Sequence, residues 1–452
     1  MKIIVFDDDP TGSQSVYGCP LLLKFDEEIL SEGILDHSKL LFLLTNTRSM
    51  SASKAEDRTR QICKSFYKAA YKNLDFRKVL FISRGDSTLR GHGVIEPNVI
   101  NQELGPFDAT FHVPAFLDGG RTTVDGEHLL NGSPVHLSSF ANDQVFGYST
   151  SYLPDWLEEK SGGKILSSNV LRLSCEQLNA AIQSSKGMDN LIQFLKKLSN
   201  NSLVVVDAEK STQLKIFAKA VIELMNEKRF LFRSAASLIS ALADLPVNPM
   251  NQSEFSSLRL KRNRSNLKGL IMVGSHVELA DKQLDFLLKD SGCKGVELPV
   301  KEIARALDSP LSQVLLRDLK ELYLSQLDNI IESGKTPVIY TSRGEIDFPS
   351  VSKRMLFGIQ LAELMANLVA RLLPRIGYVI SKGGITTQVF LEKGLNLGMV
   401  ELKGQILPGL SVVCPYKKNS NSQIPVITFP GNLGNSETLL ESWKLMENMI
   451  KD

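Results

Sequence analysis

The chain has 452 residues, of which 43% are hydrophobic and 23% are charged, and these are ordinary proportions for a soluble globular protein of two or three domains. The formal net charge of +2 argues against a large nucleic-acid-binding surface, so no nucleic-acid partner is expected. Five scattered cysteines without a CxxC pair indicate a reducing compartment. We find no apolar run long enough to span a bilayer, and acidic residues interrupt the N-terminal apolar run too early for a signal peptide. We therefore expect a cytoplasmic protein with no membrane partner.

The first predicted element is an apolar strand over residues 3–6 that runs directly into three aspartates at 7–9. Proline, threonine and glycine follow at 10–12, so the carboxylates are expected on a tight loop at the end of the strand. Like charges this close repel one another unless a metal ion, an Arg or Lys, or a shared proton compensates them. Taken alone, the stretch is equally compatible with a solvated acidic turn.

Short apolar runs later in the chain each end in polar or glycine residues, and near-continuous apolar strands are what a sheet buried on both faces requires. These predicted strands cover 39–44, 79–82, 203–206, 270–273, 338–340, 378–380 and 425–429. Helical spacing predicts helices over 53–72, 311–331, 351–373 and 436–450. Ser53 and Glu56 have the spacing of a capping box at the start of the first of these helices.

The alternation of strands and helices predicts an α/β protein with mostly parallel sheets flanked by helices. A stretch rich in Pro, Ser, Arg, Lys and Asn at 246–264 separates two apolar-patterned halves. We expect two domains, 1–245 and 265–452, joined by this linker. Ligands of such sheets bind beyond the carboxyl ends of the strands, where the polar clusters of this chain fall.

Two polar segments in the first half carry arginines beside glycines. Arg84, Asp86 and Arg90 follow the strand at 79–82, and the planar fork of Arg suits a carboxylate or a phosphate. The alternative for this segment is an Arg90–Asp86 pair that only stabilises the start of a helix. The second segment, with Gly119 and Gly120, is weak on its own because tandem glycines mark many turns.

Three glycine-bearing loops follow strands in the second half, and consecutive backbone N–H groups in such loops can bind anions. They are Gly274-Ser275-His276, Ser381-Lys382-Gly383-Gly384-Ile385-Thr386 and Pro430-Gly431-Asn432. None is a GxxxxGK[ST] phosphate-binding loop. The six histidines show no zinc-type spacing, and no residue is assigned to a metal.

With these motifs together, the chain resembles the four-carbon acid sugar kinase family over nearly its whole length. Four family motifs are matched in the first half: D-D-x-T-G at 8–12, D-S-T-L-R-G at 86–91, P-A-F-x-x-G-G-R-x-T at 114–123 and F-G-Y at 146–148. Three more are matched in the second half: K-G-G-I-T at 382–386, G-Q-x-L-P-G at 404–409 and P-G-N at 430–432. The sequence departs from the family at Ala280-Asp281 and at Gln388, both on the expected nucleotide side.

The resemblance implies a kinase that transfers the γ-phosphate of ATP, with Mg²⁺, to a threonate, erythronate or oxo-tetronate. It implies that the first domain holds the acid, the second holds ATP, and the active site lies in the cleft between them. The implied catalytic residues are Asp8 and Asp9. The implied substrate-binding residues are Thr11, Gly12, Arg84, Asp86, Ser87, Arg90, Gly119 and Gly120. The implied nucleotide-binding residues are Ser275, His276, Ser381, Lys382, Gly383, Gly384, Thr386, Gly409, Gly431 and Asn432.

Two other functions stay open at this point, and so does a homodimer. The first is a haloacid-dehalogenase-type phosphohydrolase, because Asp7, Asp9 and Thr11 satisfy the spacing DxDxT, with Asp7 as covalent nucleophile. No paired-aspartate metal motif follows further along the chain. The second is a non-catalytic sensor that binds a sugar acid through Arg84 and Arg90.

Overall fold

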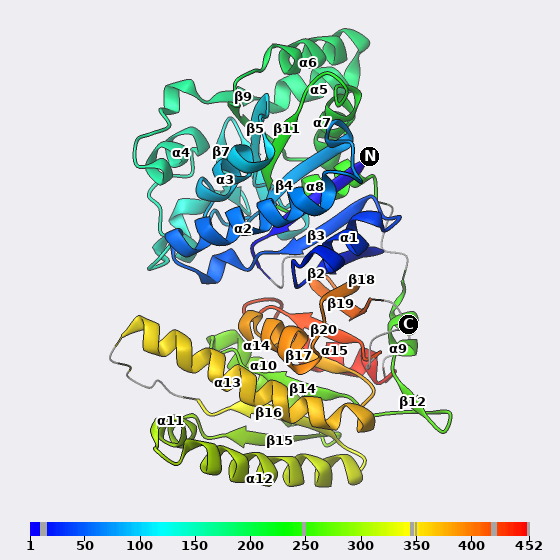
Figure 1. Ribbon diagram of the computed structural model, residues 1–452. Helices are drawn as coiled ribbons and strands as arrows, with labels where there is room; N and C mark the ends of the chain where they lie inside the picture. Colours follow the sequence, from blue (N-terminus) through cyan, green and yellow to red (C-terminus); the bar gives the residue numbers. More distant parts are fainter. Residues whose placement is uncertain (10–15, 246–249, 344–347, 349, 417–422, 450–452) are drawn as a thin grey trace. The chain divides into compact units, whose positions relative to one another are not determined.

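The computed structural model describes the chain except for residues 10–15, 246–249, 344–347, 349, 417–422 and 450–452 (Figure 1). Thr11 and Gly12, which were expected in the substrate site, therefore lie outside the described residues. The chain divides into two compact units, Met1–Val247 (unit 1) and Asn248–Asp452 (unit 2). Each is an α/β unit.

Unit 1 is built on a sheet with the strand order β2-β3-β1-β4-β11-β5-β10-β9, in which all neighbouring strands are parallel. The strands are β1 (Lys2–Asp7), β2 (Cys19–Leu22), β3 (Leu40–Leu44), β4 (Val79–Arg84), β5 (Ala109–Val113), β9 (Leu171–Leu173), β10 (Ser202–Val206) and β11 (Phe230–Ser234). A small antiparallel sheet adds β6 (Arg121–Val124), β7 (Glu127–Leu130) and β8 (Ser133–Pro134).

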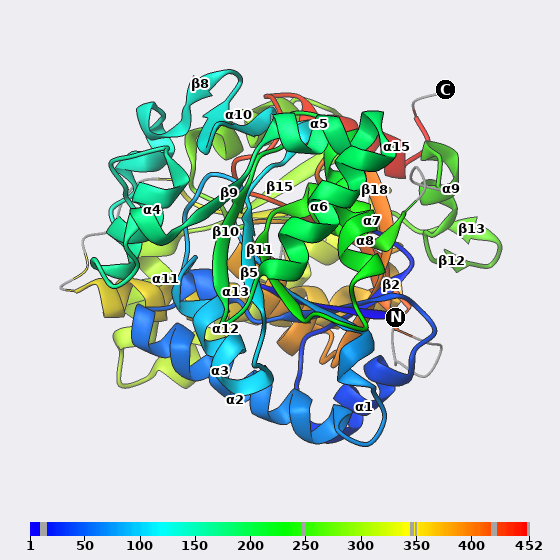
Figure 2. The same cartoon turned by 90° about the horizontal axis from the view of Figure 1, so that it is seen from above.

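Helices cover both faces of the large sheet of unit 1. Figure 2 shows α1, α2 and α3 on one side of the strands and α5, α6, α7 and α8 on the other. The helices are α1 (Glu27–Leu35), α2 (Ala52–Ala70), α3 (Ile95–Leu104), α4 (Leu153–Ser161), α5 (Cys175–Gln183), α6 (Ser185–Lys197), α7 (Ser211–Glu223) and α8 (Ala236–Ala243). This coverage explains why the central strands are apolar on both faces.

Unit 2 has the strand order β15-β16-β14-β17-β20-β19-β18, parallel from β15 to β20 and antiparallel at the β19 and β18 end. Its strands are β14 (Leu270–Val273), β15 (Cys293–Leu298), β16 (Thr336–Thr341), β17 (Val379–Lys382), β18 (Met399–Leu407), β19 (Leu410–Pro415) and β20 (Val426–Phe429). Its helices are α9 (Gln252–Ser257), α10 (Glu278–Leu288), α11 (Val300–Asp308), α12 (Ser312–Glu332), α13 (Val351–Leu372), α14 (Gly384–Val389) and α15 (Thr438–Met446). The short strands β12 (Lys261–Arg262) and β13 (Ser265–Asn266) form a hairpin.

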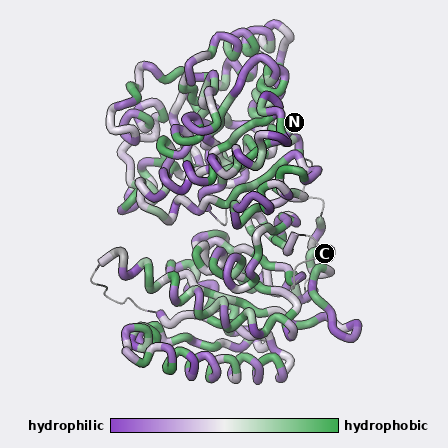
Figure 3. Tube along the Cα trace, in the orientation of Figure 1, coloured by the Kyte–Doolittle hydropathy of each residue, from purple (hydrophilic) through white to green (hydrophobic). Residues whose placement is uncertain are grey.

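The burial of the strands follows the apolar runs of the sequence. In unit 2, Ile271 and Ile380 of the sheet pack with Leu287 of α10 and Trp443 of α15, and all four side chains are buried. Figure 3 shows hydrophobic and hydrophilic residues alternating along the outer helix α12, as expected for a helix with one buried face. The predicted α/β class with two mostly parallel sheets is confirmed.

Three local expectations need correction. Helix α2 begins at Ala52 with Ser51 as its N-cap residue, so Ser53 lies inside the first turn and the predicted capping box does not form. The expected linker at 246–264 contains α9 and β12, and Phe255 of α9 is buried in the core of unit 2. Burial of the Phe255 ring stabilises the folded state more than exposure in a linker would, which explains why this segment folds as part of unit 2.

The third correction concerns α13. Residues Lys353–Arg375 are long and apolar enough to span a membrane by length and composition, although no such run was expected. Half of the most apolar 18-residue stretch within this range is buried in the protein, and Met365 and Val369 are among the buried residues of the helix. A core helix of a globular unit has the same composition because its apolar face packs against a sheet.

Candidate active site

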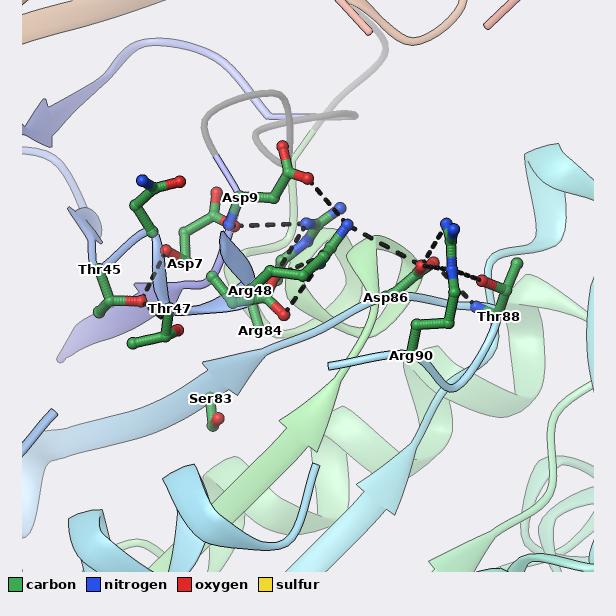
Figure 4. Close-up of polar contacts among 12 residues, drawn as sticks. Asp7, Asp9, Thr45, Thr47, Arg48, Ser83, Arg84, Asp86, Thr88 and Arg90 are labelled. Carbon is green, nitrogen blue, oxygen red and sulfur yellow. Dashed lines mark hydrogen bonds and ion pairs between the residues drawn. The ribbon is translucent and has the colours of Figure 1, made fainter. Parts of the chain in front are cut away.

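Asp7 and Asp9 lie at the carboxyl edge of the unit 1 sheet (Figure 4), and Asp8 stands between them in the chain. Asp7 is the last residue of β1, and in the register of the sheet it lies between Leu44 of β3 and Arg84 of β4. The carboxyl ends of parallel strands meet at one edge, so the residues that follow these three strands gather around the aspartates.

Arg48 lies at the centre of this cluster, although sequence reasoning gave it no role. Its guanidinium is 2.6 Å from Asp8 Oδ1, 2.9 Å from Asp9 Oδ2 and 3.9 Å from Asp86 Oδ2. It comes from the short turn after β3, where Thr45 donates to the Asp7 carbonyl oxygen at 2.9 Å and so ties that turn to β1. The positive charge that the acidic run required is therefore supplied by arginine.

Asp8 and Asp9 differ in their access to solvent. The Asp8 side chain is 1% exposed and also lies 3.7 Å from Arg84 and 3.6 Å from Arg233. The Asp9 side chain is 22% exposed, and the Arg48 side chain that it contacts is 20% exposed. Asp9 is thus the more accessible carboxylate to a ligand that enters from solvent.

Asp7 is buried below the other two aspartates. Burial raises the pKa of Asp7 to about 7, and the nearby Arg84 charge opposes that rise. Its carboxylate accepts from Arg84 Nη1 at 3.3 Å and from the Asp9 backbone N–H at 3.4 Å. Its exposed fraction is 1%, which argues against a role for this carboxylate as the nucleophile that attacks a phosphate ester.

This raised pKa predicts a pH dependence of stability. Between the ordinary pKa of an aspartate and about 7, the folded chain keeps a proton on Asp7 that the unfolded chain has lost, so this group makes stability fall as the pH rises. Asp7→Asn cannot titrate, and its melting temperature should fall less than the wild-type value between pH 5 and pH 8. Thermal melts at four pH values measure this, with Asp57→Asn on α2 as the control. Parallel curves for Asp7→Asn and the wild type would contradict the prediction.

A second, fully buried layer lies beneath Asp8. Arg233 of β11 donates to Ser83 Oγ at 2.7 Å and forms a close ion pair with Glu96 of α3, while Thr47 donates to Glu96. Burial raises the pKa of Glu96, and the Arg233 charge opposes that rise. A Cβ atom at Gly85 would lie 2.2 Å from the Arg233 guanidinium, so glycine at this position makes room for the layer.

The D-S-T-L-R-G loop brings Asp86 and Arg90 to the same edge. Arg90 Nε donates to Asp86 Oδ2 at 2.8 Å, so the pair of the alternative interpretation forms, but it does not lie at a helix start, because α3 begins only at Ile95. Burial alone would raise the pKa of Asp86, but the Arg48 and Arg90 charges lower it well below its ordinary value. Tyr148 of the F-G-Y motif donates its hydroxyl to the Thr88 carbonyl oxygen at 2.8 Å and so anchors the loop.

A cavity in unit 1 adjoins this loop. Asp86, Arg90 and Arg233 line it, and α4 contributes an apolar wall with Leu153 and Trp156. The indole N–H of Trp156 is buried and has no acceptor among the described residues. The cavity therefore offers hydrogen-bond donors next to the arginine–aspartate cluster.

Other expected substrate residues lie further from Asp8. The Ser87 carbonyl oxygen accepts from His128 Nε2 at 2.7 Å. Gly119 and Gly120 form the turn before β6, where Arg121 Nη1 donates to the Gly119 carbonyl oxygen at 2.6 Å. Among the described residues no hydrogen bond joins these positions to Arg48 or Asp9, so their substrate role stays a prediction.

In unit 2, the sheet brings the three glycine-bearing loops together. Val273, Lys382 and Phe429 are register partners at the ends of β14, β17 and β20. A Cβ atom at Gly274 would lie 2.1 Å from Thr386 Oγ1, and one at Gly431 would lie 2.5 Å from Ser275 Oγ. The Cβ positions of these two glycines are filled by hydroxyl side chains of the neighbouring loops, so the glycines let the three loops pack closely at the carboxyl edge of the sheet. We call this edge, lined by glycines and hydroxyl groups, the cradle.

The remaining expected nucleotide residues lie in or near this cradle. Gly383 has a φ of +122°, which favours glycine, and Gly384 begins α14. The hydroxyls of Ser381 and Thr387 bond to each other at 3.0 Å beneath it. A Cβ atom at Gly409 would contact Leu433 at 2.7 Å, beside the exposed Asn432.

The two departures from the family pattern have local partners. Asp281 of α10 lies 3.0 Å from Arg343 Nε, at the end of β16. Gln388 donates to Glu392 Oε1 at 3.0 Å. Burial and the Arg343 charge lower the pKa of His276, whose Nε2 lies 3.2 Å from Thr341 Oγ1. Arg343 was another residue that sequence reasoning gave no role.

Comparison with known proteins identifies both units. Residues 3–242 match the family described as the sugar-binding N-terminal domain, and residues 270–439 match the nucleotide-binding C-terminal domain. The chain belongs to the four-carbon acid sugar kinase family. The resemblance inferred from the motifs is thereby confirmed, and the kinase class with it.

Two characterised members of the four-carbon acid sugar kinase family match nearly end to end. A D-threonate kinase from Salmonella typhimurium is 24% identical, with 99% of each chain covered. A D-erythronate kinase from Heliobacterium modesticaldum is 23% identical, with 96% of this chain and 95% of that protein covered.

Solved structures show the same fold. A Salmonella typhimurium protein superposes with a TM-score of 0.66 at 16% identity, with 98% of each chain covered. A Haemophilus influenzae protein superposes with a TM-score of 0.62 at 16% identity, with 99% of each chain covered. At these identities the likeness shows the fold alone.

Proposed function

We propose that this protein transfers the γ-phosphate of ATP to a hydroxyl group of a four-carbon sugar acid of the threonate, erythronate or oxo-tetronate type. The observation that carries the proposal is the pairing of two different sites in one chain of this family. Unit 1 presents the partly exposed side chains of Arg48 and Asp9 in its arginine–aspartate cluster, and unit 2 presents a glycine-lined cradle at Gly274 and Gly431.

Arg48 and Arg90 are the proposed ligands of the acid's carboxylate. Their side chains are 20% and 24% exposed, whereas the Arg84 side chain is only 7% exposed. A guanidinium can bind a carboxylate through two parallel N–H groups. Arg84, which was expected to clamp the substrate, is instead proposed to hold the acidic loop in place.

Asp9 is the proposed general base. It would take the proton of the acceptor hydroxyl as that oxygen attacks the γ-phosphorus and the bond to the β-phosphate oxygen breaks, releasing ADP. Its partial exposure supports this assignment over Asp8, which is buried among three arginines. Asp8 is then proposed to fix the position of Arg48.

A polyphosphate is the proposed ligand of the cradle of unit 2, because three glycine-bearing loops and their hydroxyl groups gather there at the carboxyl edge of the sheet. Among the described residues, no group of three or more His, Cys, Asp or Glu side chains has the arrangement to hold a metal ion by itself. In kinases Mg²⁺ is usually bound by the nucleotide's phosphates, water and one or two carboxylates, and here it would neutralise the charge of those phosphates.

The hydrolase alternative is disfavoured by the burial of Asp7, and the sensor alternative is separated by experiment. Purified protein with Mg-ATP should release ADP only when a threonate, erythronate or oxo-tetronate is added. Phosphate release from sugar phosphates without ATP would support the hydrolase instead. Tight acid binding without any ADP formation would support the sensor.

The five cysteines are all free thiols in the structure, which supports the proposed cytoplasmic location.

A further inference from the structure

Two cations lie close to the phosphate cradle of unit 2, and they are Lys382 and Arg343. Lys382 was expected from the K-G-G-I-T motif to bind the nucleotide. Arg343 is the second residue after the end of β16. Their surroundings indicate different roles, and the inference drawn from them rests on the proposed kinase function.

Lys382 is already occupied within the protein. Its side chain is fully buried, and its Nζ donates to the carbonyl oxygens of Pro430 and Gly431 at 3.1 and 3.2 Å. The same Nζ lies 3.9 Å from the centre of the Phe429 ring, a cation–π distance. The ammonium group therefore holds the P-G-N loop from inside the protein and has no face left towards solvent.

Lys382 is also a poor source of positive charge at neutral pH. Burial, together with the nearby Arg343 charge, lowers its pKa to about 7. An arginine keeps its charge under all physiological conditions. Arg343 therefore supplies a permanent positive charge at this edge of unit 2.

Arg343 has hydrogen-bonding capacity that the described residues do not use. Its Nη1 donates to the Ser275 carbonyl oxygen at 2.7 Å, and its Nε lies 3.0 Å from Asp281 Oδ1. Its Nη2 atom is buried and has no acceptor among the described residues. The Ser275 hydroxyl lies next to Gly431 in the cradle, so the bond to the Ser275 carbonyl oxygen fixes the guanidinium beside the cradle.

We propose that Arg343 is the phosphate-binding cation of unit 2, and that Lys382 is a positioning residue that acts through the Pro430-Gly431 loop without touching the nucleotide. Asp281, one of the departures from the family pattern, then orients the guanidinium of Arg343 through the ion pair at its Nε. The ligand class is the phosphate chain of a nucleoside di- or triphosphate.

Titration calorimetry of the full-length protein with Mg-ADP tests this assignment. Arg343→Gln is expected to weaken ADP binding about 10- to 100-fold, the range for a lost hydrogen bond to a charged group. Arg343→Lys should lose less, because it keeps the charge. Arg317→Gln, on the exposed side of α12, is the matched control and should bind ADP like the wild type.

The outcomes separate this inference from the proposed function. An ADP affinity of Arg343→Gln within threefold of the wild type would overturn the role of Arg343. If the melting temperature of Arg343→Gln falls by more than a few degrees, Arg343→Lys decides: a smaller affinity loss than for Gln supports the inference, and an equal loss refutes it. A wild-type protein that binds no adenine nucleotide would overturn the kinase proposal itself.

Discussion

Asp9→Asn is expected to lower kcat for the sugar acid by about 10²- to 10⁴-fold, which is the typical contribution of a positioned general base. The asparagine carbonyl can still accept from Arg48, whose guanidinium also remains paired with Asp8 at 2.6 Å. The melting temperature and the affinity for ADP should therefore match those of the wild type. Coupled measurement of ADP release under saturating ATP, with calorimetry and thermal melts, checks all three quantities.

The matched control for this variant is Asp57→Asn on the exposed face of α2, which removes the same charge from unit 1 away from the cluster. It should keep the wild-type kcat. A kcat for Asp9→Asn within threefold of the wild type would remove Asp9 from the reaction. Asp8→Asn is not an equivalent test, because its carboxylate is buried against Arg48 and Arg233 and its loss would disturb both.

The fold was largely predictable because its strands are short apolar runs with clear ends. The run at 270–273 is β14 residue for residue, and the run at 203–206 lies inside β10. Helix boundaries were less certain, since α2 starts at Ala52 through a cap that makes no side-chain hydrogen bond. The edge pair β18 and β19 was not predicted, because pairing of an antiparallel hairpin depends on register and not on hydrophobicity alone.

The site was predictable only where its residues stand in a motif. Asp9 and Asp86 follow strands and are acidic, so the sequence marks them. Glu96 and Arg233 are 137 positions apart, on a helix and at the end of a strand, and nothing local distinguishes them from surface charges. Arg48 also follows a strand, and its position after β3 was the signal that could have identified it.

Arg233→Met is expected to destabilise the protein by about 3–5 kcal/mol, the usual cost of removing one partner of a buried ion pair. Glu96 would stay buried without its counter-charge, and the Asp8 carboxylate would lose a cation at 3.6 Å. For a unit of this size, 1 kcal/mol corresponds to roughly 2–4 °C, so the melting temperature should fall by about 6–20 °C.

The double variant Glu96→Gln with Arg233→Met separates the charge from the packing. Because the amide needs no counter-charge, the double variant should be less destabilised than the sum of the single variants. Arg60→Met is the control: Arg60 also has two carboxylate partners, Glu56 and Glu103, but its side chain is 30% exposed, and such pairs contribute about 0–1 kcal/mol. Additive effects in calorimetric melts would show that the buried pair is not coupled. A coupled pair, in contrast, means that the layer beneath Asp8 is held by electrostatics, and that the position of the acidic loop depends on two residues outside every motif of the sequence.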